Sequence, residues 1–96
     1  MDKIEQKICD IIDAHRDELI AFGEDLWTHA ELGFQEFRTA EKFAEKMKGL
    51  GLRTQEGLAV TGVKSYLKDD AHGPTVCLMG EFDGLPIPTH AYANPE

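Results

Sequence analysis

Residues 73–86, with the sequence GPTVCLMGEFDGLP, decide the fold class of this chain. Apolar side chains follow one another from Val76 to Met79, so a strand here would place apolar groups on both faces of a sheet. Such strands are typical of the centre of α/β sheets, whereas strands with one face in water alternate apolar and polar residues. We therefore expect an α/β fold in which residues 75–82 form a strand that is covered on both faces.

The chain before this run predicts two amphipathic helices. Apolar residues recur every three or four positions along residues 2–28, which predicts one long helix, with Gly23 as the point where it could bend or break. A second apolar stripe predicts a helix over residues 34–50 that ends beside Gly51, because glycine is the usual residue at a left-handed helix end.

Residues 52–70 predict one or two short strands, from their β-branched residues, their alternation and the glycines at 57 and 62. Two helices and two or three strands can cover one face of a sheet but hardly both, and so small a sheet leaves its edges open. We therefore expect residues 1–96 to be the N-terminal part of a larger domain, incomplete as given.

The charge and cysteine content exclude several classes of partner. Lys and Arg number 10 against 18 Asp and Glu, a formal net charge of −8, which argues against nucleic-acid and anionic-membrane partners. The first ten residues have no unbroken apolar stretch, so no signal peptide or membrane span is predicted there. Cys9 and Cys77 are too few for a disulfide framework, and we expect a cytoplasmic chain with reduced thiols.

Two carboxylates follow the apolar run at the carboxyl end of the expected strand. Glu81 and Asp83 are two residues apart, so both would point to the same side of the pleat. Ligands and metals bind at that end of the strands in open α/β sheets. There the carboxylates could ligate a divalent metal, orient a metal-bound histidine, or act as an acid or base. Alternatively, Asp83 and Gly84 form only a turn, and Glu81 is solvated.

The histidines do not add a metal motif to these carboxylates. None forms a His-Glu-x-x-His pair or another compact cluster with metal-ligand spacing. His15 falls on the apolar stripe of the first helix and is expected to be partly buried, and His72 is expected in an exposed turn. No Gly-x-Ser-x-Gly elbow or Gly-rich phosphate loop is present, so serine-hydrolase and nucleotide-binding functions lack support.

Three stretches, in this order, resemble the N-terminal segment of the di-metal amidohydrolase and aminoacylase family: WTHAELGFQEFRTAEKFAEKMKGLGL from Trp27, TGVKSYL from Thr61, and GPTVCLMGEFDGLP. This family of metallopeptidase-like hydrolases includes aminoacylases, aminobenzoyl-glutamate hydrolases and auxin-conjugate hydrolases. The chain departs from the family pattern where Ala30 replaces a proline and Gly84 replaces an alanine.

The resemblance implies that residues 1–96 are the N-terminal part of a metallo-amidohydrolase catalytic domain with a mixed, zinc-peptidase-like sheet. It implies cleavage of the amide bond of small substrates, either N-acyl amino acids or aminobenzoyl-glutamate-type compounds, with two divalent ions, zinc or manganese. Asp83 matches the aspartate that stands beside the metal site and orients a ligand. Glu81 and His90 are the weaker candidates for metal ligation, and neither is expected to be a ligand. His29 and Glu31 are expected to serve packing and a turn.

The family's metal ligands are missing from this sequence. The His-Ala-Cys-Gly-His run and the adjacent glutamate pair that includes the general base are both absent. The resemblance therefore predicts that the chain alone is inactive and holds no metal. A lone metal-binding domain that uses Glu81, Asp83 and His90 is a weaker hypothesis. A further alternative is a small non-enzymatic helical module, because the heptad-like stripe of the first helix could dimerise or bind a partner helix.

Overall fold

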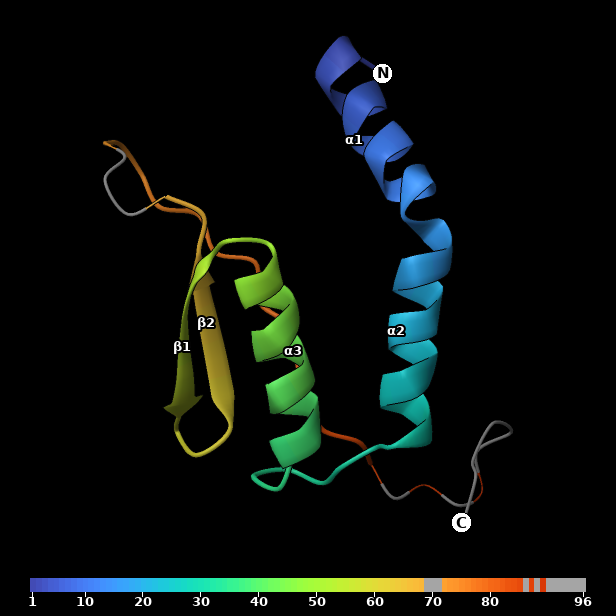
Figure 1. The fold of residues 1–96 in the computed structure, drawn as a ribbon, viewed down its shortest axis with the longest axis vertical. Coiled ribbons are helices and arrows are strands. Elements are labelled where there is room, and N and C mark those ends of the chain that lie inside the picture. Colours follow the sequence, from blue (N-terminus) through green and yellow to red (C-terminus); the bar gives the residue numbers. More distant parts are fainter. Residues whose placement is uncertain (69–71, 86, 88, 90–96) are drawn as a thin grey trace.

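The computed structural model of the chain describes residues 1–68, 72–85, 87 and 89. These residues form three helices and a two-stranded antiparallel sheet, which confirms the predicted α/β character; the larger catalytic domain stays a prediction. Figure 1 shows two helices following one another as an arm, beside a third helix that packs against a hairpin. The elements are α1 (Lys3–Ala14), α2 (Arg16–Thr28), α3 (Phe37–Gly49), β1 (Arg53–Leu58) and β2 (Gly62–Tyr66).

The expected single long helix is divided into α1 and α2 at His15, which corrects the prediction of a break at Gly23. The backbone of His15 leaves the helical region with φ −103° and ψ 14°, and its N–H is shared between the carbonyls of Ile11 and Ile12. Asp17 and Glu18 then stand in the first turn of α2, where the helix dipole favours negative charge. A new helix start is therefore favourable here, whereas Gly23 lies within α2.

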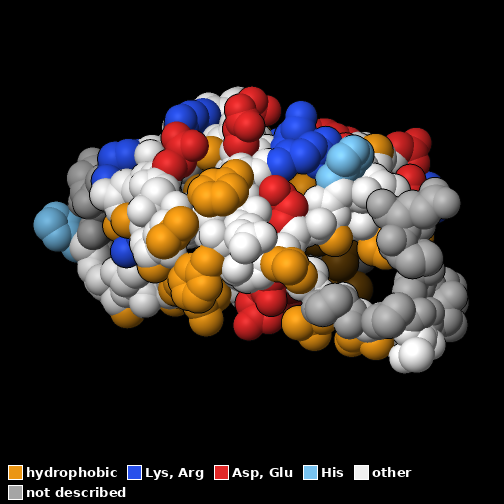
Figure 2. Space-filling view, turned by 90° about the horizontal axis from the view of Figure 1, so that it is seen from below, with side chains coloured by type: hydrophobic (Ala, Val, Ile, Leu, Met, Phe, Trp, Pro, Cys, Tyr) orange, Lys and Arg blue, Asp and Glu red, His pale blue; other side chains and the backbone are white. Residues whose placement is uncertain are grey.

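The apolar stripe of the arm remains open to solvent. Helix α1 begins with a capping box, in which the Asp2 side chain accepts from the Glu5 N–H at 2.8 Å and the Glu5 side chain accepts from the Asp2 N–H at 3.0 Å. No described residue of α1 or α2 is buried. Figure 2, which views the molecule from the end away from α1, shows apolar side chains interspersed with acidic ones on that face too. The exposed residues of the stripe include Ile4, Ile8, Ile11, Ile12 and Leu19.

Helix α3 and the hairpin form the packed part of the structure. Ala44, on α3, is the one buried apolar residue among those described, at 1% exposure. Thr39 is buried on the same helix. The helix ends at Gly49. Gly51 then has a φ of +80°, the left-handed backbone for which glycine was expected at this helix end. The second predicted helix is therefore confirmed, although it begins three residues later than expected.

The hairpin confirms the predicted strands, and its turn requires a glycine. Arg53 pairs with Tyr66 and Leu58 with Gly62. A Cβ at Gly62 would lie 2.5 Å from the Leu58 carbonyl oxygen, so the close approach of the two strands excludes a side chain there. Ala59 and Val60 have φ of 47° and 82°, values that residues other than glycine rarely adopt and that β-branched residues such as valine adopt least.

Residues 75–82 do not form the expected strand, and this corrects the sequence prediction. Within the part of the chain that the structure describes, this segment makes no ladder with β1 or β2 and passes behind α3 (Figure 1). Val76, Leu78 and Met79 are exposed. A strand that is apolar on both faces needs paired neighbours and cover on each face, and the described residues supply neither.

No described helix has the length and apolar character that crossing a membrane requires.

Candidate functional site

The segment that carries Glu81 and Asp83 is anchored on the turn between α2 and α3. The Gly84 N–H donates to the Glu31 carbonyl oxygen at 2.6 Å. A Cβ at Gly84 would lie 3.0 Å from the Ala30 Cβ, closer than about nine in ten real contacts of a Cβ atom. Gly84 therefore permits the two segments to approach each other, directly after Asp83.

The Glu31 carboxylate binds the first turn of α3. Its Oε1 accepts from the Thr39 N–H at 2.7 Å and from the Thr39 hydroxyl at 2.8 Å, and its Oε2 accepts from the Arg38 N–H at 3.1 Å. Desolvation raises the pKa of Glu31, but these hydrogen bonds outweigh it and hold the pKa below its ordinary value. The ionised carboxylate therefore satisfies free N–H groups at the start of α3. The expectation that Glu31 serves local packing and a turn fits this geometry.

Arg38 links this turn to α2. Its Nη2 donates to the Asp25 Oδ1 at 2.9 Å, and this hydrogen bond lowers the pKa of Asp25. The His29 Nδ1 lies 2.9 Å from the Asp25 carbonyl oxygen and 3.1 Å from the Thr28 hydroxyl. These contacts assign His29 to the end of α2, in agreement with the packing role expected for it.

The two predicted carboxylates lie on the surface, on either side of a half-buried aromatic residue. Glu81 and Asp83 are exposed. Between them, Phe82 stacks on Phe43 of α3 with ring centroids 4.7 Å apart. This alternation is what an extended chain gives, even though the segment is not paired in a sheet. His90 lies outside the described residues.

Two other histidines, His15 and His72, lie on the surface. His15, expected to be partly buried, is exposed, and its Nδ1 lies 3.2 Å from the Glu18 Oε2. That expectation was wrong because α1 and α2 have no covering element on this side within the described residues. His72 is exposed, as predicted.

The donor groups described do not fit a metal centre. No group of three or more His, Cys, Asp or Glu side chains able to hold a metal ion occurs in residues 1–68, 72–85, 87 and 89. A divalent metal ion is typically held by several protein ligands in a fixed geometry, with water completing the coordination. Glu81 and Asp83 alone therefore do not account for the two metal ions that the resemblance implies.

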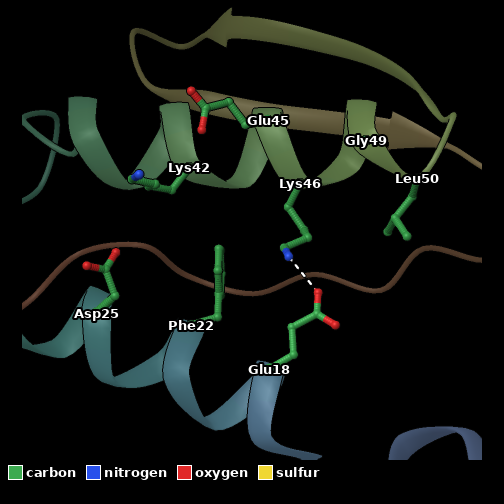
Figure 3. A pocket seen from close by; sticks show the side chains of 8 residues that line it. All are labelled: Glu18, Phe22, Asp25, Lys42, Glu45, Lys46, Gly49 and Leu50. Carbon is green, nitrogen blue, oxygen red and sulfur yellow. Dashed lines mark hydrogen bonds and ion pairs between the residues drawn. The ribbon is translucent and has the colours of Figure 1, made fainter. Parts of the chain in front are cut away.

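An open groove of about 480 Å³ between α2 and α3 was not predicted from the sequence. Figure 3 shows the Lys46 side chain of α3 reaching across it to Glu18 of α2, where their Nζ and Oε1 atoms are 2.7 Å apart. This hydrogen bond lowers the pKa of Glu18. Lys46 also stands 5.7 Å from the centre of the Phe22 ring. Because Glu18 and Lys46 are far apart in the sequence, no local pattern signals their pairing, and neither Glu81 nor Asp83 lines the groove.

Comparison with known proteins finds several related sequences. YhaA of Bacillus subtilis, which carries the name of an amidohydrolase, is 30% identical over 84 residues, 88% of this chain and 21% of its own. One of the p-aminobenzoyl-glutamate hydrolase polypeptides of Escherichia coli is 28% identical over 86 residues, 88% of this chain and 18% of its own. Hippurate hydrolase of Campylobacter jejuni is 37% identical over 57 residues, 59% of this chain and 15% of its own.

The chain thus spans about a fifth of the length of these relatives. No family model matches it, and no solved structure matches it. All three relatives are nevertheless named as hydrolases. Their aligned regions cover between 59% and 88% of this chain. Over most of its length the chain is therefore similar to the amidohydrolases, and the family resemblance predicted from its motifs is confirmed.

Proposed function

We propose that residues 1–96 form part of the catalytic domain of a metal-dependent amidohydrolase. Its substrates are N-acyl amino acids or aminobenzoyl-glutamate-type compounds, in which an amide bond joins an acyl or aryl group to an amino acid. The observation that carries this proposal is the sequence similarity to an aminobenzoyl-glutamate hydrolase and a hippurate hydrolase. Hippurate is itself an N-acyl amino acid, so both names indicate the same kind of bond.

The residues described contribute Asp83 and the structure that holds it. Its carboxylate is exposed while its two neighbours are held, Phe82 by stacking on Phe43 and Gly84 by its hydrogen bond to Glu31. An exposed carboxylate on a held backbone can accept a hydrogen bond from a histidine or from substrate without first being ordered. In the proposed enzyme, the ligands of two zinc or manganese ions come from residues other than those described here.

A chimeric enzyme tests this proposal. The part of the Campylobacter jejuni hippurate hydrolase that corresponds to residues 27–85 of this chain would be replaced by these residues, and hippurate hydrolysis would be measured with zinc or manganese. We expect the chimera to hydrolyse hippurate. A folded chimera that binds metal as the parent does, yet leaves hippurate intact, would contradict the proposed function.

The Asp83→Asn variant of the chimera tests the role of the carboxylate. Replacing a carboxylate that orients a ligand should lower kcat/KM by roughly 10–100-fold, because such partners typically contribute that much to metal affinity or activity. Glu41→Gln, on α3, is the matched control, since Glu41 is exposed and lies far along the chain from residues 80–85. Equal activity of Asp83→Asn and the control would remove Asp83 from the site.

The chain by itself should be inactive toward hippurate and aminobenzoyl-glutamate, with or without added metal. Hydrolysis that appears with zinc or manganese and disappears with a chelator would mean that the chain holds its own metal centre. The alternative function, a non-enzymatic helical module, is not favoured, because the relatives named above are all named as hydrolases.

A further inference from the structure

We propose that Glu31 is a positioning residue for Asp83, joining the N-terminus of α3 to the segment that carries this carboxylate. The inference rests on the proposed function, in which Asp83 acts at the reaction site. Glu31 makes the connection through both its side chain and its main chain. Its side chain binds α3, and its main-chain carbonyl binds Gly84.

The side chain fixes Glu31 to the packed part of the structure. Its carboxylate accepts three hydrogen bonds, two from main-chain N–H groups of α3 and one from the Thr39 hydroxyl. Thr39 is itself buried, at 3% exposure. Hydrogen bonds to an ionised group are stronger than neutral ones, and two of these use fixed backbone donors. These hydrogen bonds therefore fix Glu31 to the start of α3.

The main chain of Glu31 passes this constraint to the residue after Asp83. The Gly84 N–H reaches the Glu31 carbonyl oxygen at 2.6 Å, and the missing side chain of Gly84 leaves room for Ala30. On the other side of Asp83, Phe82 stacks on Phe43, which also belongs to α3. Both neighbours of Asp83 are thus connected to α3, Phe82 directly through Phe43 and Gly84 through Glu31. The carboxylate stays exposed while its backbone has two anchors.

Backbone resonances of the intact 96-residue chain test this connection without any activity measurement. Glu31→Ala removes the anchor on α3, so we expect the Gly84 amide to exchange with solvent about tenfold faster, a change that corresponds to about 1.4 kcal/mol. The Asp83 and Gly84 resonances should shift, while those of Ala44 and the hairpin stay in place. Glu24→Ala, an exposed glutamate of α2, should change none of these signals.

A second variant keeps the test valid if Glu31→Ala disturbs α3 more widely. Gly84→Ala places a methyl group against Ala30 and should shift the Asp83 resonances in the same way as Glu31→Ala, while the Thr39 amide is unaffected. The double variant should then shift the Asp83 resonances no more than the larger single change, because both substitutions remove the same connection. Additive effects, or an unchanged Gly84 amide in Glu31→Ala, would overturn the proposal.

In the hippurate hydrolase chimera, Glu31→Ala should lower kcat by about tenfold with little change in KM, as expected for a displaced catalytic group. Glu31→Gln keeps one acceptor oxygen and should restore part of the rate. An inactive parent chimera would refute the proposed function and leave the resonance test standing. A normal rate in Glu31→Ala, in an active chimera, would refute the positioning role alone.

Discussion

Helices α1 and α3 carry apolar stripes of similar spacing, yet the stripe of α1 is exposed to solvent and α3 is partly buried. The described residues that are buried all belong to α3, to the residue before it, or to the hairpin turn: Glu36, Thr39, Ala44 and Thr61. Helix α1 has no buried residue in the described structure, and its isoleucines face solvent. An apolar stripe therefore predicts a helix well, but whether that helix is covered depends on what lies opposite it.

The packed region also shows that polar contacts, and not apolar area alone, hold its parts together. Glu36 is 7% exposed, and its carboxylate accepts from the hydroxyl of Thr61, which is 6% exposed, at 2.6 Å. This contact joins the start of α3 to the hairpin turn, where Ala59 and Val60 have positive φ. No comparable contact ties α1 to the described residues of α3 or the hairpin.

Glu36→Ala is expected to have the largest effect on stability. It leaves the buried Thr61 hydroxyl without its acceptor and releases the turn, so the free energy of unfolding should fall by about 2–3 kcal/mol. Urea unfolding followed by circular dichroism measures this change. The control is Glu45→Ala, which removes an exposed glutamate of the same helix and should cost less than about 0.5 kcal/mol. Equal costs would mean that the Glu36–Thr61 contact does not hold the packed region.

Ala44→Leu should destabilise the packed region by about 1–3 kcal/mol. Ala44 is 1% exposed, and three added carbon atoms there would force α3 and the hairpin apart. Ala14→Leu makes the same change at an exposed position of the arm and should leave the unfolding midpoint almost unchanged. A well-tolerated leucine at position 44 would show that α3 and the hairpin are less closely packed in solution.

Acid should weaken the contacts around α3, because two carboxylates there, Glu31 and Asp25, have lowered pKa values in the folded chain. Desolvation raises the pKa of Glu31, but hydrogen bonds from Thr39 and Arg38 outweigh it, so this pKa is lowered in the folded chain. The pKa of Asp25 is lowered by its hydrogen bond to Arg38. A lowered pKa in the folded state gives stability above the ordinary carboxyl pKa, and this stability is lost as pH falls through the folded value.

The thermal midpoint should therefore decline as pH falls below about 4.5, the ordinary value for glutamate. The Glu31→Gln variant should decline less, because it has lost one of the titrating groups. A midpoint that is independent of pH between 5 and 3, roughly the range over which such paired carboxylates titrate, would contradict the hydrogen bonding assigned to Glu31.

Local signals predicted α3 and the short strands after it, whereas their pairing as a hairpin and the contacts between distant residues were not predictable. Gly51 marked a helix end because its φ of +80° favours glycine, and Gly62, which indicated short strands, lies where a Cβ would meet the Leu58 carbonyl oxygen. The Glu36–Thr61 and Glu31–Gly84 contacts join residues 25 and 53 positions apart, and neither has a sequence pattern.

The strand expected over residues 75–82 was wrong for a related reason. Its apolar residues predict burial on both faces, but that burial depends on neighbouring strands, and the described residues contain only one hairpin. The predicted role of Asp83 is independent of this error, since it depends on the position of the carboxylate and on the resemblance. It stays a prediction for the chimera to test.

Ile8→Ala should have the smallest effect, and it tests the comparison between α1 and α3 most directly. Ile8 is 53% exposed, and alanine is the better helix former by less than about 0.7 kcal/mol, so stability should stay the same or rise slightly. The measurement is urea unfolding at two protein concentrations. A loss of more than about 2 kcal/mol, which is typical of a buried isoleucine, would show that another surface covers this stripe in solution. If the loss also grew with protein concentration, that surface would belong to a second copy of the chain.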